Sequence, residues 1–170
     1  MSDITVVVLA AGKGTRMKSK LIKIMHPIAG KPMIGHVVDS AYRLGFDDVV
    51  AVVGYQQERL REYLGDRVKY VVQEEQLGTG HAVLQAAPFI DQKVGGHVLV
   101  MFGDNPFLGP KVIERLMKRH MESGAAATLL TAEVSNPFGL GRIMRDPATG
   151  RFLRIVEEKD ATAEQKLVRE

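Results

Sequence analysis

Short apolar runs alternate along this sequence with stretches whose apolar residues follow a helical spacing, and no other feature limits the fold as much. The first run, TVVVLAA at residues 5–11, is typical of a strand buried on both faces of a parallel sheet. We expect strands at residues 5–11, 48–53, 68–73, 97–102 and 126–134, and helices at residues 32–44, 56–64, 80–87 and 110–123. A strand-to-strand spacing of about 25–30 residues suits right-handed crossovers, so the pattern predicts an α/β fold with a doubly wound, mostly parallel sheet.

The pattern changes after residue 134. Residues 136–139 (NPFG) are typical of a turn, and the stretches 141–145 and 151–157 predict a β-hairpin with a turn-rich loop between them. The last stretch, 161–170, has the composition of a short polar helix.

Length and composition indicate an ordinary globular protein. The 170 residues fit about one domain over 1–170, with an α/β core at 1–134 and a hairpin and terminal helix at 135–170. The absence of cysteine excludes a disulfide scaffold, a thiolate zinc site and a cysteine nucleophile, and the five histidines lack metal-ligand spacing. The apolar stretch at 4–11 is too short to span a bilayer and lacks the features of a signal peptide. A cytoplasmic protein without membrane contact is therefore expected.

Positive charge is concentrated near the N-terminus, although the net charge is only +3. Residues 1–43 carry seven Lys and Arg against two acidic residues. This local excess suits a small polyanion better than a long nucleic acid, which would require a basic stripe with interleaved aromatic residues. Aromatic residues make up only 6% of the chain, so no nucleic-acid partner is expected.

Three loops follow predicted strands and carry residues suited to chemistry. The first is LAAGKGTRM at residues 9–17, where a glycine-rich loop would offer backbone N–H groups to phosphates at the carboxyl edge of the sheet. Arg16 would add a forked cation and Lys23 a second positive charge. The loop matches neither the Walker pattern nor the dinucleotide fingerprint. A tight turn with a solvated basic edge explains the same residues equally well.

The second loop is QEEQLGTGHA at residues 73–82. A glutamine can read the edge of a base with a paired donor and acceptor, and Gly78 and Gly80 would let a ring approach the backbone. Thr79 can instead be the N-cap of the following helix, and taken alone this loop favours the cap.

The third loop is FGDNP at residues 102–106, where an apolar strand ends in a carboxylate. Asp104 at the mouth of a parallel sheet suits Mg²⁺, which takes one or two carboxylates together with phosphate oxygens. An Asx-turn that closes the strand before Pro106 is the simpler explanation. Three such loops at three strand ends are harder to explain as turns alone.

Together these loops resemble those of the sugar nucleotidyltransferases, and most closely the bacterial N-acetylglucosamine-1-phosphate uridyltransferase domain. LAAGKGTRM is similar to that family's nucleotide loop, QEEQLGTGHAV to its uracil loop and FGDNPFL to its metal-binding strand end. GKPMIGHVV resembles its first helix, and GLGRIMRD with IVEEKDATAEQ resembles its sugar-side hairpin. The resemblance runs in the same order from about residue 5 to residue 170, and it implies a Rossmann-like fold of the nucleotide-diphospho-sugar transferase type.

The resemblance also implies a role for individual residues. The nucleotide would be contacted by Leu9, Ala10, Ala11, Gly12, Gly14, Gln73, Gly78 and Thr79, the last three at the uracil. Arg16 and Lys23 would neutralise the triphosphate as catalytic residues, and Asp104 would bind Mg²⁺. The amino sugar would face Gly103, Gly141 and Glu157. The implied reaction transfers UMP from UTP to N-acetylglucosamine 1-phosphate, with UTP and the sugar 1-phosphate as the small-molecule partners.

Some positions depart from the family pattern. Ile22 stands where the family usually has Pro, and Leu140 where it usually has Tyr, which would loosen the Lys23 loop and the sugar contact. The chain stops before the family's N-acetyl-binding Asn and second metal ligand, so the domain is expected to be truncated. Two alternatives stay open: a non-catalytic nucleotide-binding module, completed by a second copy or a partner chain, and a nucleotidyltransferase for another base or acceptor.

Overall fold

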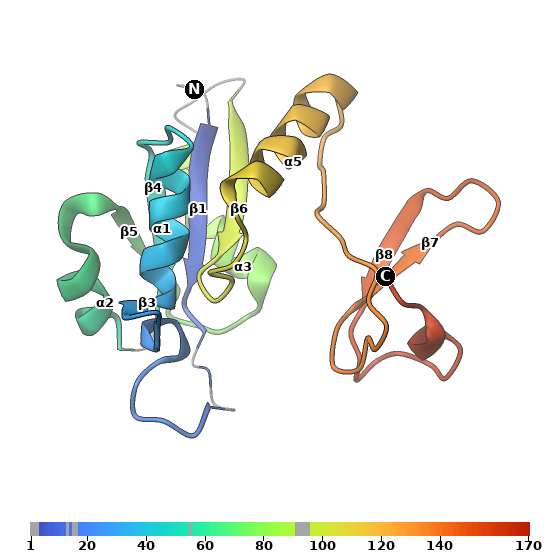
Figure 1. The fold of residues 1–170 in the computed structure, drawn as a ribbon, viewed down its shortest axis with the longest axis horizontal. Helices are drawn as coiled ribbons and strands as arrows, with labels where there is room; N and C mark the ends of the chain where they lie inside the picture. Colours follow the sequence, from blue (N-terminus) through green and yellow to red (C-terminus); the bar gives the residue numbers. More distant parts are fainter. Residues whose placement is uncertain (1–3, 13, 15–16, 55, 91–95) are drawn as a thin grey trace. The chain divides into compact units, whose positions relative to one another are not determined.

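The computed structural model describes residues 4–12, 14, 17–54, 56–90 and 96–170, and Figure 1 shows its ribbon. The residues form two compact units, Met1–Arg115 and Leu116–Glu170, which are described separately below. In the part of the chain that the structure describes, every helix is too short or too polar to cross a membrane.

The first unit is built on a parallel sheet. The strands of this unit are β1 (Ile4–Ala10), β2 (Pro27–Ile28), β3 (Lys31–Pro32), β4 (Val49–Val53), β5 (Lys69–Val72) and β6 (His97–Phe102). Its helices are α1 (Met33–Arg43), α2 (Gln57–Leu64), α3 (Thr79–Leu84) and α4 (Ala87–Ile90), with the 3-10 turns η2 (Lys23–Met25) and η3 (Gly65–Arg67). Helix α5 (Pro110–Ser123) begins in this unit and ends in the second. Four strands pair in parallel in the order β5-β4-β1-β6, which confirms the predicted α/β fold, and β2 and β3 form a small antiparallel pair.

Helices cover both faces of this sheet, as Figure 1 shows for α1 in front of β1 and α3 behind it. Val7 and Val50, on one face, pack with Ala82 and Ala86 of the α3 region. Helix α1 turns its apolar residues inward at a spacing of three to four, which buries Ile34, Val37, Val38 and Ala41. The central strand is therefore buried on both sides, and its carboxyl end opens at one edge of the sheet.

The helix expected at residues 80–87 is interrupted in the structure. Helix α3 ends at Leu84, and α4 starts at Ala87. Pro88 has no backbone N–H to donate to the carbonyl of Leu84, four residues earlier, so the ladder of a continuous helix cannot form across this point.

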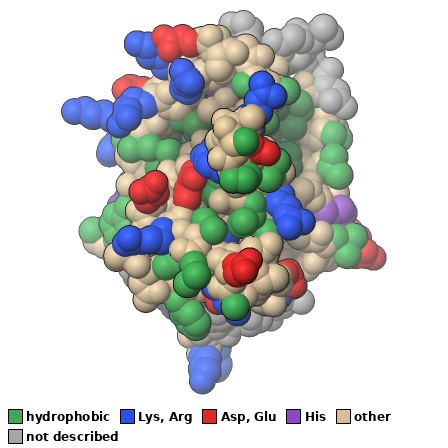
Figure 2. Space-filling model, turned by 90° about the vertical axis from the view of Figure 1, so that its right-hand side faces the viewer, with side chains coloured by type: hydrophobic (Ala, Val, Ile, Leu, Met, Phe, Trp, Pro, Cys, Tyr) green, Lys and Arg blue, Asp and Glu red, His purple; other side chains and the backbone are tan. Residues whose placement is uncertain are grey.

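The second unit contains the predicted hairpin. Strands β7 (Arg142–Arg145) and β8 (Phe152–Val156) pair antiparallel, and a 3-10 turn, η4 (Gln165–Leu167), follows. Figure 2 shows apolar side chains (green) exposed among charged ones on one face of the molecule. In this unit the large exposed apolar residues include Leu129, Leu130, Phe138, Phe152 and Ile155.

Two sequence expectations for this unit are wrong. Residues 126–134, all of them described, form no strand. Of their backbone N–H groups only that of Val134 donates to a distant residue, the carbonyl of Arg169 (2.9 Å), and a strand needs a ladder of such bonds. Residues 161–170 form only the turn η4 instead of a helix. A polar helix this short is marginal without packing, and Glu170 is held in an extended tail, where its carbonyl accepts a hydrogen bond from Ile143 N–H (2.8 Å).

Candidate functional site

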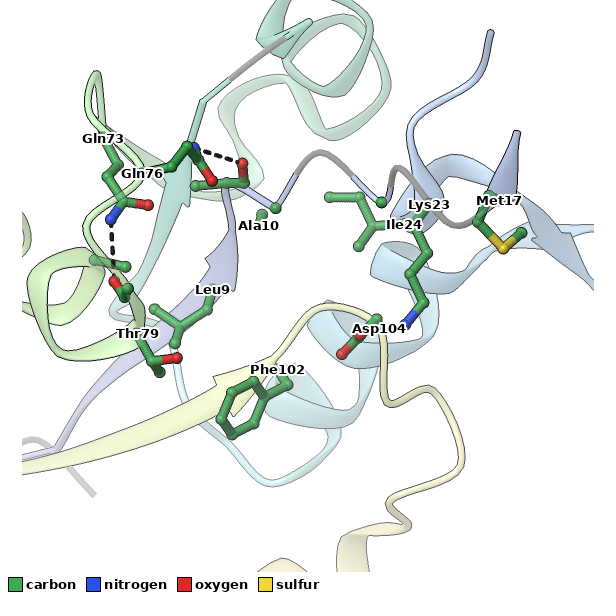
Figure 3. Close-up of a pocket in the computed structure, with 15 residues that line it drawn as sticks. Leu9, Ala10, Met17, Lys23, Ile24, Gln73, Gln76, Thr79, Phe102 and Asp104 are labelled. Atoms are coloured by element: carbon green, nitrogen blue, oxygen red, sulfur yellow. Dashed lines mark hydrogen bonds and ion pairs between the residues drawn. The ribbon is translucent and has the colours of Figure 1, made fainter. Parts of the chain in front are cut away.

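The three loops singled out from the sequence meet in one cavity of about 690 Å³ in the first unit, at the carboxyl ends of β1, β5 and β6. This volume lies within the range of about 300–1,000 Å³ that is usual for small-molecule sites. Figure 3 shows the side chains around it. Its lining residues are Leu9, Ala10, Ala11, Gly12, Gly14, Met17, Lys23, Ile24, Gln73, Gln76, Gly78, Thr79, Ala82, Phe102 and Asp104. Ten of the predicted site residues are therefore brought together, whereas the predicted catalytic Arg16 lies outside the described residues.

In the loop after β1, Lys23 lines the cavity and packs closely against Gly14. Gly14 has φ +61°, in the left-handed region, and its carbonyl accepts a hydrogen bond from Met17 N–H (2.9 Å). A Cβ built on Gly14 would lie 2.6 Å from the Cβ of Lys23, far inside van der Waals contact. Glycine is required here for both reasons.

The backbone before Lys23 does not need the proline of the family pattern. Ile22 has φ −61° and ψ 147°, close to the values that proline favours, and its side chain is buried. The Lys23 turn is thus held by packing of Ile22 instead of by a proline ring.

Lys23 and Asp104 face each other across the cavity wall (Figure 3). The Lys23 Nζ lies 2.6 Å from the Asp104 Oδ2, and each side chain is about 40% exposed. Asp104 follows the end of β6, where Asn105 N–H donates to the Phe102 carbonyl (3.1 Å). A backbone hydrogen bond therefore closes this turn. The carboxylate of Asp104 pairs with Lys23 and does not form the Asx-turn considered from the sequence.

Asp104 suits a divalent cation that arrives with phosphate. Among the described residues no group of three or more His, Cys, Asp or Glu side chains could hold a metal ion. Magnesium commonly binds through one or two carboxylates, keeps several waters, and takes its remaining ligands from phosphate oxygens. A single, half-exposed carboxylate beside a lysine fits that donor set.

The loop after β5 is shaped by Gln73 and Gly78. Gln73 N–H donates to the Val53 carbonyl (2.8 Å), which extends the β4–β5 pairing by one residue and buries the Gln73 side chain to 4% exposure. The Gln73 Nε2 donates to the Gly78 carbonyl (3.1 Å), as the dashed line in Figure 3 shows. Gly78, with φ +99°, is the N-cap of α3, so the prediction that Thr79 caps this helix is wrong. Thr79 is the first helical residue and lines the cavity.

Gln76 is a lining residue that the sequence prediction missed. Its Nε2 donates to the Ala11 carbonyl (3.0 Å) and so joins the loop after β5 to the loop after β1. A Cβ on Gly54 would come within 3.2 Å of this Nε2 and 3.0 Å of the Ala11 carbonyl oxygen, so the junction is tightly packed. The signal was present, since Gln76 lies in the same glutamine-rich loop as Gln73, but the pattern does not say which glutamine joins the loops.

The predicted sugar-side residues are divided between the two units. Gly103 does not line the cavity; its N–H donates to the Leu9 carbonyl (2.9 Å), and a Cβ there would lie 2.9 Å from that oxygen and from the Ile34 Cδ1. Close packing of β6 against β1 and α1 is therefore enough to require glycine. Gly141 and Glu157 lie in the second unit, where a Cβ on Gly141 would be 3.9 Å from the Glu157 Oε1.

A buried arginine organises the hairpin that carries Gly141. Arg142, 2% exposed, donates to the Leu140 carbonyl and to the Glu158 Oε2 (2.6 Å), and this oxygen also accepts from Gly139 N–H (3.2 Å). The hydrogen bond from Arg142 is the main influence that holds the pKa of Glu158 below its ordinary value. The arginine thereby ties the loop before β7 to the residues after β8.

Known proteins share both the sequence and the fold. The family model of the MobA-like NTP transferase domain matches residues 6–167. Over all 170 residues the chain is 71% identical to the bifunctional protein GlmU of Symbiobacterium thermophilum and 50% identical to that of Halalkalibacterium halodurans. It spans 36% and 37% of their lengths, so it corresponds to little more than a third of these relatives.

Solved structures agree on the fold. The crystal structure of Rv0371c from Mycobacterium tuberculosis matches with a TM-score of 0.54 and 25% identity, over 69% of this chain and 60% of that one. A nucleotidyl transferase from Methanothermobacter matches with a TM-score of 0.58, over 69% of this chain and 58% of that one; at 22% identity this likeness shows the fold alone. With the family match over nearly the whole chain, these findings confirm the resemblance to nucleotidyltransferases that the loops indicate. The chain belongs to the family of MobA-like NTP transferase domains.

Proposed function

We propose that this chain carries the nucleotide site of an enzyme that transfers UMP from UTP to N-acetylglucosamine 1-phosphate, giving UDP-N-acetylglucosamine and pyrophosphate. The observation that carries the proposal is the convergence of the two glycine-bearing loops with Lys23 and Asp104 on one cavity. The high identity to GlmU proteins supports it, as does the uracil-loop resemblance of residues 73–82.

The nucleotide would lie along the cavity with its base at the α3 end. Gln73, Gly78 and Thr79 would contact the uracil, since a buried amide and exposed backbone groups meet there. The loop after β1, at residues 9–14, would lie against the ribose and the phosphates, with Lys23 as a positive charge beside them. Arg16, which lies outside the described residues, is proposed as a second positive charge on the triphosphate.

Magnesium would be held by Asp104 together with the phosphates, and it would neutralise charge on the phosphoryl groups. Lys23 already lies 2.6 Å from that carboxylate, so positive charge is held at the corner where phosphates would enter. The chain's contribution to rate is then positioning and charge neutralisation.

The reaction requires no general base from the protein. A phosphate monoester is already largely dianionic near pH 7, so an oxygen of the sugar 1-phosphate can attack directly. The bond from this oxygen to the α-phosphorus of UTP forms as the bond to the pyrophosphate oxygen breaks. Gly103, Gly141 and Glu157 are the proposed contacts of the amino sugar.

A pyrophosphate-release assay tests this proposal. The purified chain is incubated with Mg²⁺, each of the four NTPs in turn, and either N-acetylglucosamine 1-phosphate or another sugar 1-phosphate. Release with UTP and N-acetylglucosamine 1-phosphate alone is expected. Nucleotide affinity is measured in parallel by titration calorimetry on the same samples and on Asp104→Ala and Arg16→Ala.

The outcomes separate the candidate functions. Release with a different base or acceptor would assign another nucleotidyltransferase reaction. Binding of UTP that both variants weaken, without release of pyrophosphate, would favour a nucleotide-binding module that another segment or chain completes. A chain that binds no nucleotide would refute the proposal.

A further inference from the structure

The side-chain amide of Gln73 is held in one orientation by its surroundings. Its Nε2 lies 3.1 Å from the carbonyl oxygen of Gly78, and a carbonyl can only accept a hydrogen bond. The amide nitrogen, and not the oxygen, must therefore face Gly78. In Figure 3 the amide oxygen of Gln73 points away from this bond, toward the side where Leu9 and Ala10 line the cavity. Among the described residues, none donates a hydrogen bond to that oxygen.

His81 receives the second hydrogen of the same amide. The Nδ1 of His81 lies 3.0 Å from the Gln73 Nε2. Because this nitrogen is fixed as a donor by Gly78, the Nδ1 must be the acceptor, and a neutral His81 then carries its proton on Nε2. The geometry thus defines the tautomer of His81 as well as the orientation of Gln73.

Gln85 competes for the other ring nitrogen of His81. The Gln85 Nε2 lies 3.1 Å from the His81 Nε2 and also 3.1 Å from the His81 carbonyl. Two N–H groups cannot bond to each other, so one of the glutamines must give way. Gln73 is 4% exposed, so loss of a hydrogen-bond partner there costs more than at Gln85, which is only half-buried and can turn its amide to solvent. The hydrogen bond from the buried Gln73 therefore decides the tautomer of His81.

We propose that His81 is a positioning residue that sets base specificity by holding the Gln73 oxygen toward the nucleotide, an inference that rests on the proposed function. An oxygen fixed in the cavity accepts a hydrogen bond from the ring N–H of uracil. It faces a lone pair on the corresponding nitrogen of cytosine. The Gly78 carbonyl and the His81 Nδ1 together hold the two hydrogens of this amide. Loss of the His81 acceptor leaves Gly78 as the one remaining partner described for this nitrogen, so the amide turns more often, presents its N–H groups and accepts cytosine more readily.

The test compares UTP and CTP binding to the full chain by titration calorimetry. His81→Leu keeps the bulk of the ring and removes the acceptor, and it is expected to lower the UTP-to-CTP affinity ratio by about 3- to 10-fold, the worth of one hydrogen bond. His81→Asn places an amide oxygen near the position of Nδ1 and is expected to restore most of the ratio. Gln85→Ala is the matched control and is expected to leave the ratio unchanged.

A merely structural role for His81 would weaken both nucleotides in parallel and leave their ratio intact, which would overturn the inference. Proton–nitrogen correlation spectra of the unaltered protein provide a second measurement that needs no variant. They are expected to show the Nε2–H tautomer when the ring is neutral, and the Nδ1–H tautomer would overturn the inference. A chain that binds neither nucleotide contradicts the proposed function and this inference together, whereas binding with an unchanged ratio in His81→Leu contradicts the inference alone.

Discussion

Substituting Gly14 by alanine tests whether the loop after β1 is built around its contact with Lys23. The left-handed backbone at Gly14, with φ +61°, costs an alanine about 1–2 kcal/mol. The new Cβ would lie 2.6 Å from the Cβ of Lys23, which is attached to the backbone and cannot swing away like the end of a long side chain. Relieving such an overlap typically costs a further 1–3 kcal/mol or so.

The free energy of unfolding of Gly14→Ala is therefore expected to fall by about 2–5 kcal/mol. Two glycines of the same unit are matched controls. Gly45 has φ +80° with no atom within 4 Å of a built Cβ, so Gly45→Ala reports backbone strain alone, about 1–2 kcal/mol. Gly12 lacks both the positive φ and any close atom, so Gly12→Ala should change stability by less than about 0.5 kcal/mol.

Urea unfolding followed by circular dichroism measures the three free energies. UTP titration adds a second readout, because displacement of Lys23 should weaken UTP binding to Gly14→Ala even under conditions where that variant is fully folded. If Gly14→Ala loses no more stability than Gly45→Ala, the collision with Lys23 is absent and the reasoning is refuted.

Two further predictions concern carboxylates of the second unit. Hydrogen bonds from Arg145 and Thr131 lower the pKa of Glu170 to about 2 from its ordinary 4.5, so its stabilising effect is complete above about pH 4.5 and is lost as the pH falls toward 2. Glu170→Gln should thus lower the free energy of unfolding at pH 7 by about 1 kcal/mol at most, since Arg145 is 43% exposed. The difference from the unaltered chain should shrink as the pH falls through about 2 and vanish below it; a difference in urea unfolding that does not shrink would contradict this. Glu158→Gln should speed amide hydrogen exchange at Gly139, whose N–H bonds to that carboxylate, and should lower the melting temperature because Arg142 stays buried without its counter-charge. Glu157→Gln serves as the control, and equal effects of the two changes would refute the role of Arg142.

The sheet and the three loops could be predicted from the sequence because their signals are local. A run such as TVVVLAA specifies a buried strand by itself, and Gly45 after α1 specifies where that helix ends. The loops could be placed together because the carboxyl ends of parallel strands share an edge.

The features that could not be predicted from the sequence depend on contacts between residues that are far apart along the chain. Residues 126–134 have the pattern of a strand, but pairing is decided by what lies beside them, and here only Val134 finds a backbone partner across, in Arg169. The ion pair of Lys23 with Asp104 joins residues 81 positions apart, which no spacing rule encodes. The part played by His81 was likewise hidden, since it follows from the way the turn at Gly78 folds back on Gln73.

The strand order β5-β4-β1-β6 has a consequence for synthesis on the ribosome. Strand β1 is translated first and lies in the middle of the sheet, but the pairing of residue 4 must wait for residue 97 to be made. At typical translation rates this delay is roughly 5–20 s. During that interval an almost wholly apolar strand has no partner on one edge, so the nascent chain depends on β4 and α1, or on chaperones, to shield it.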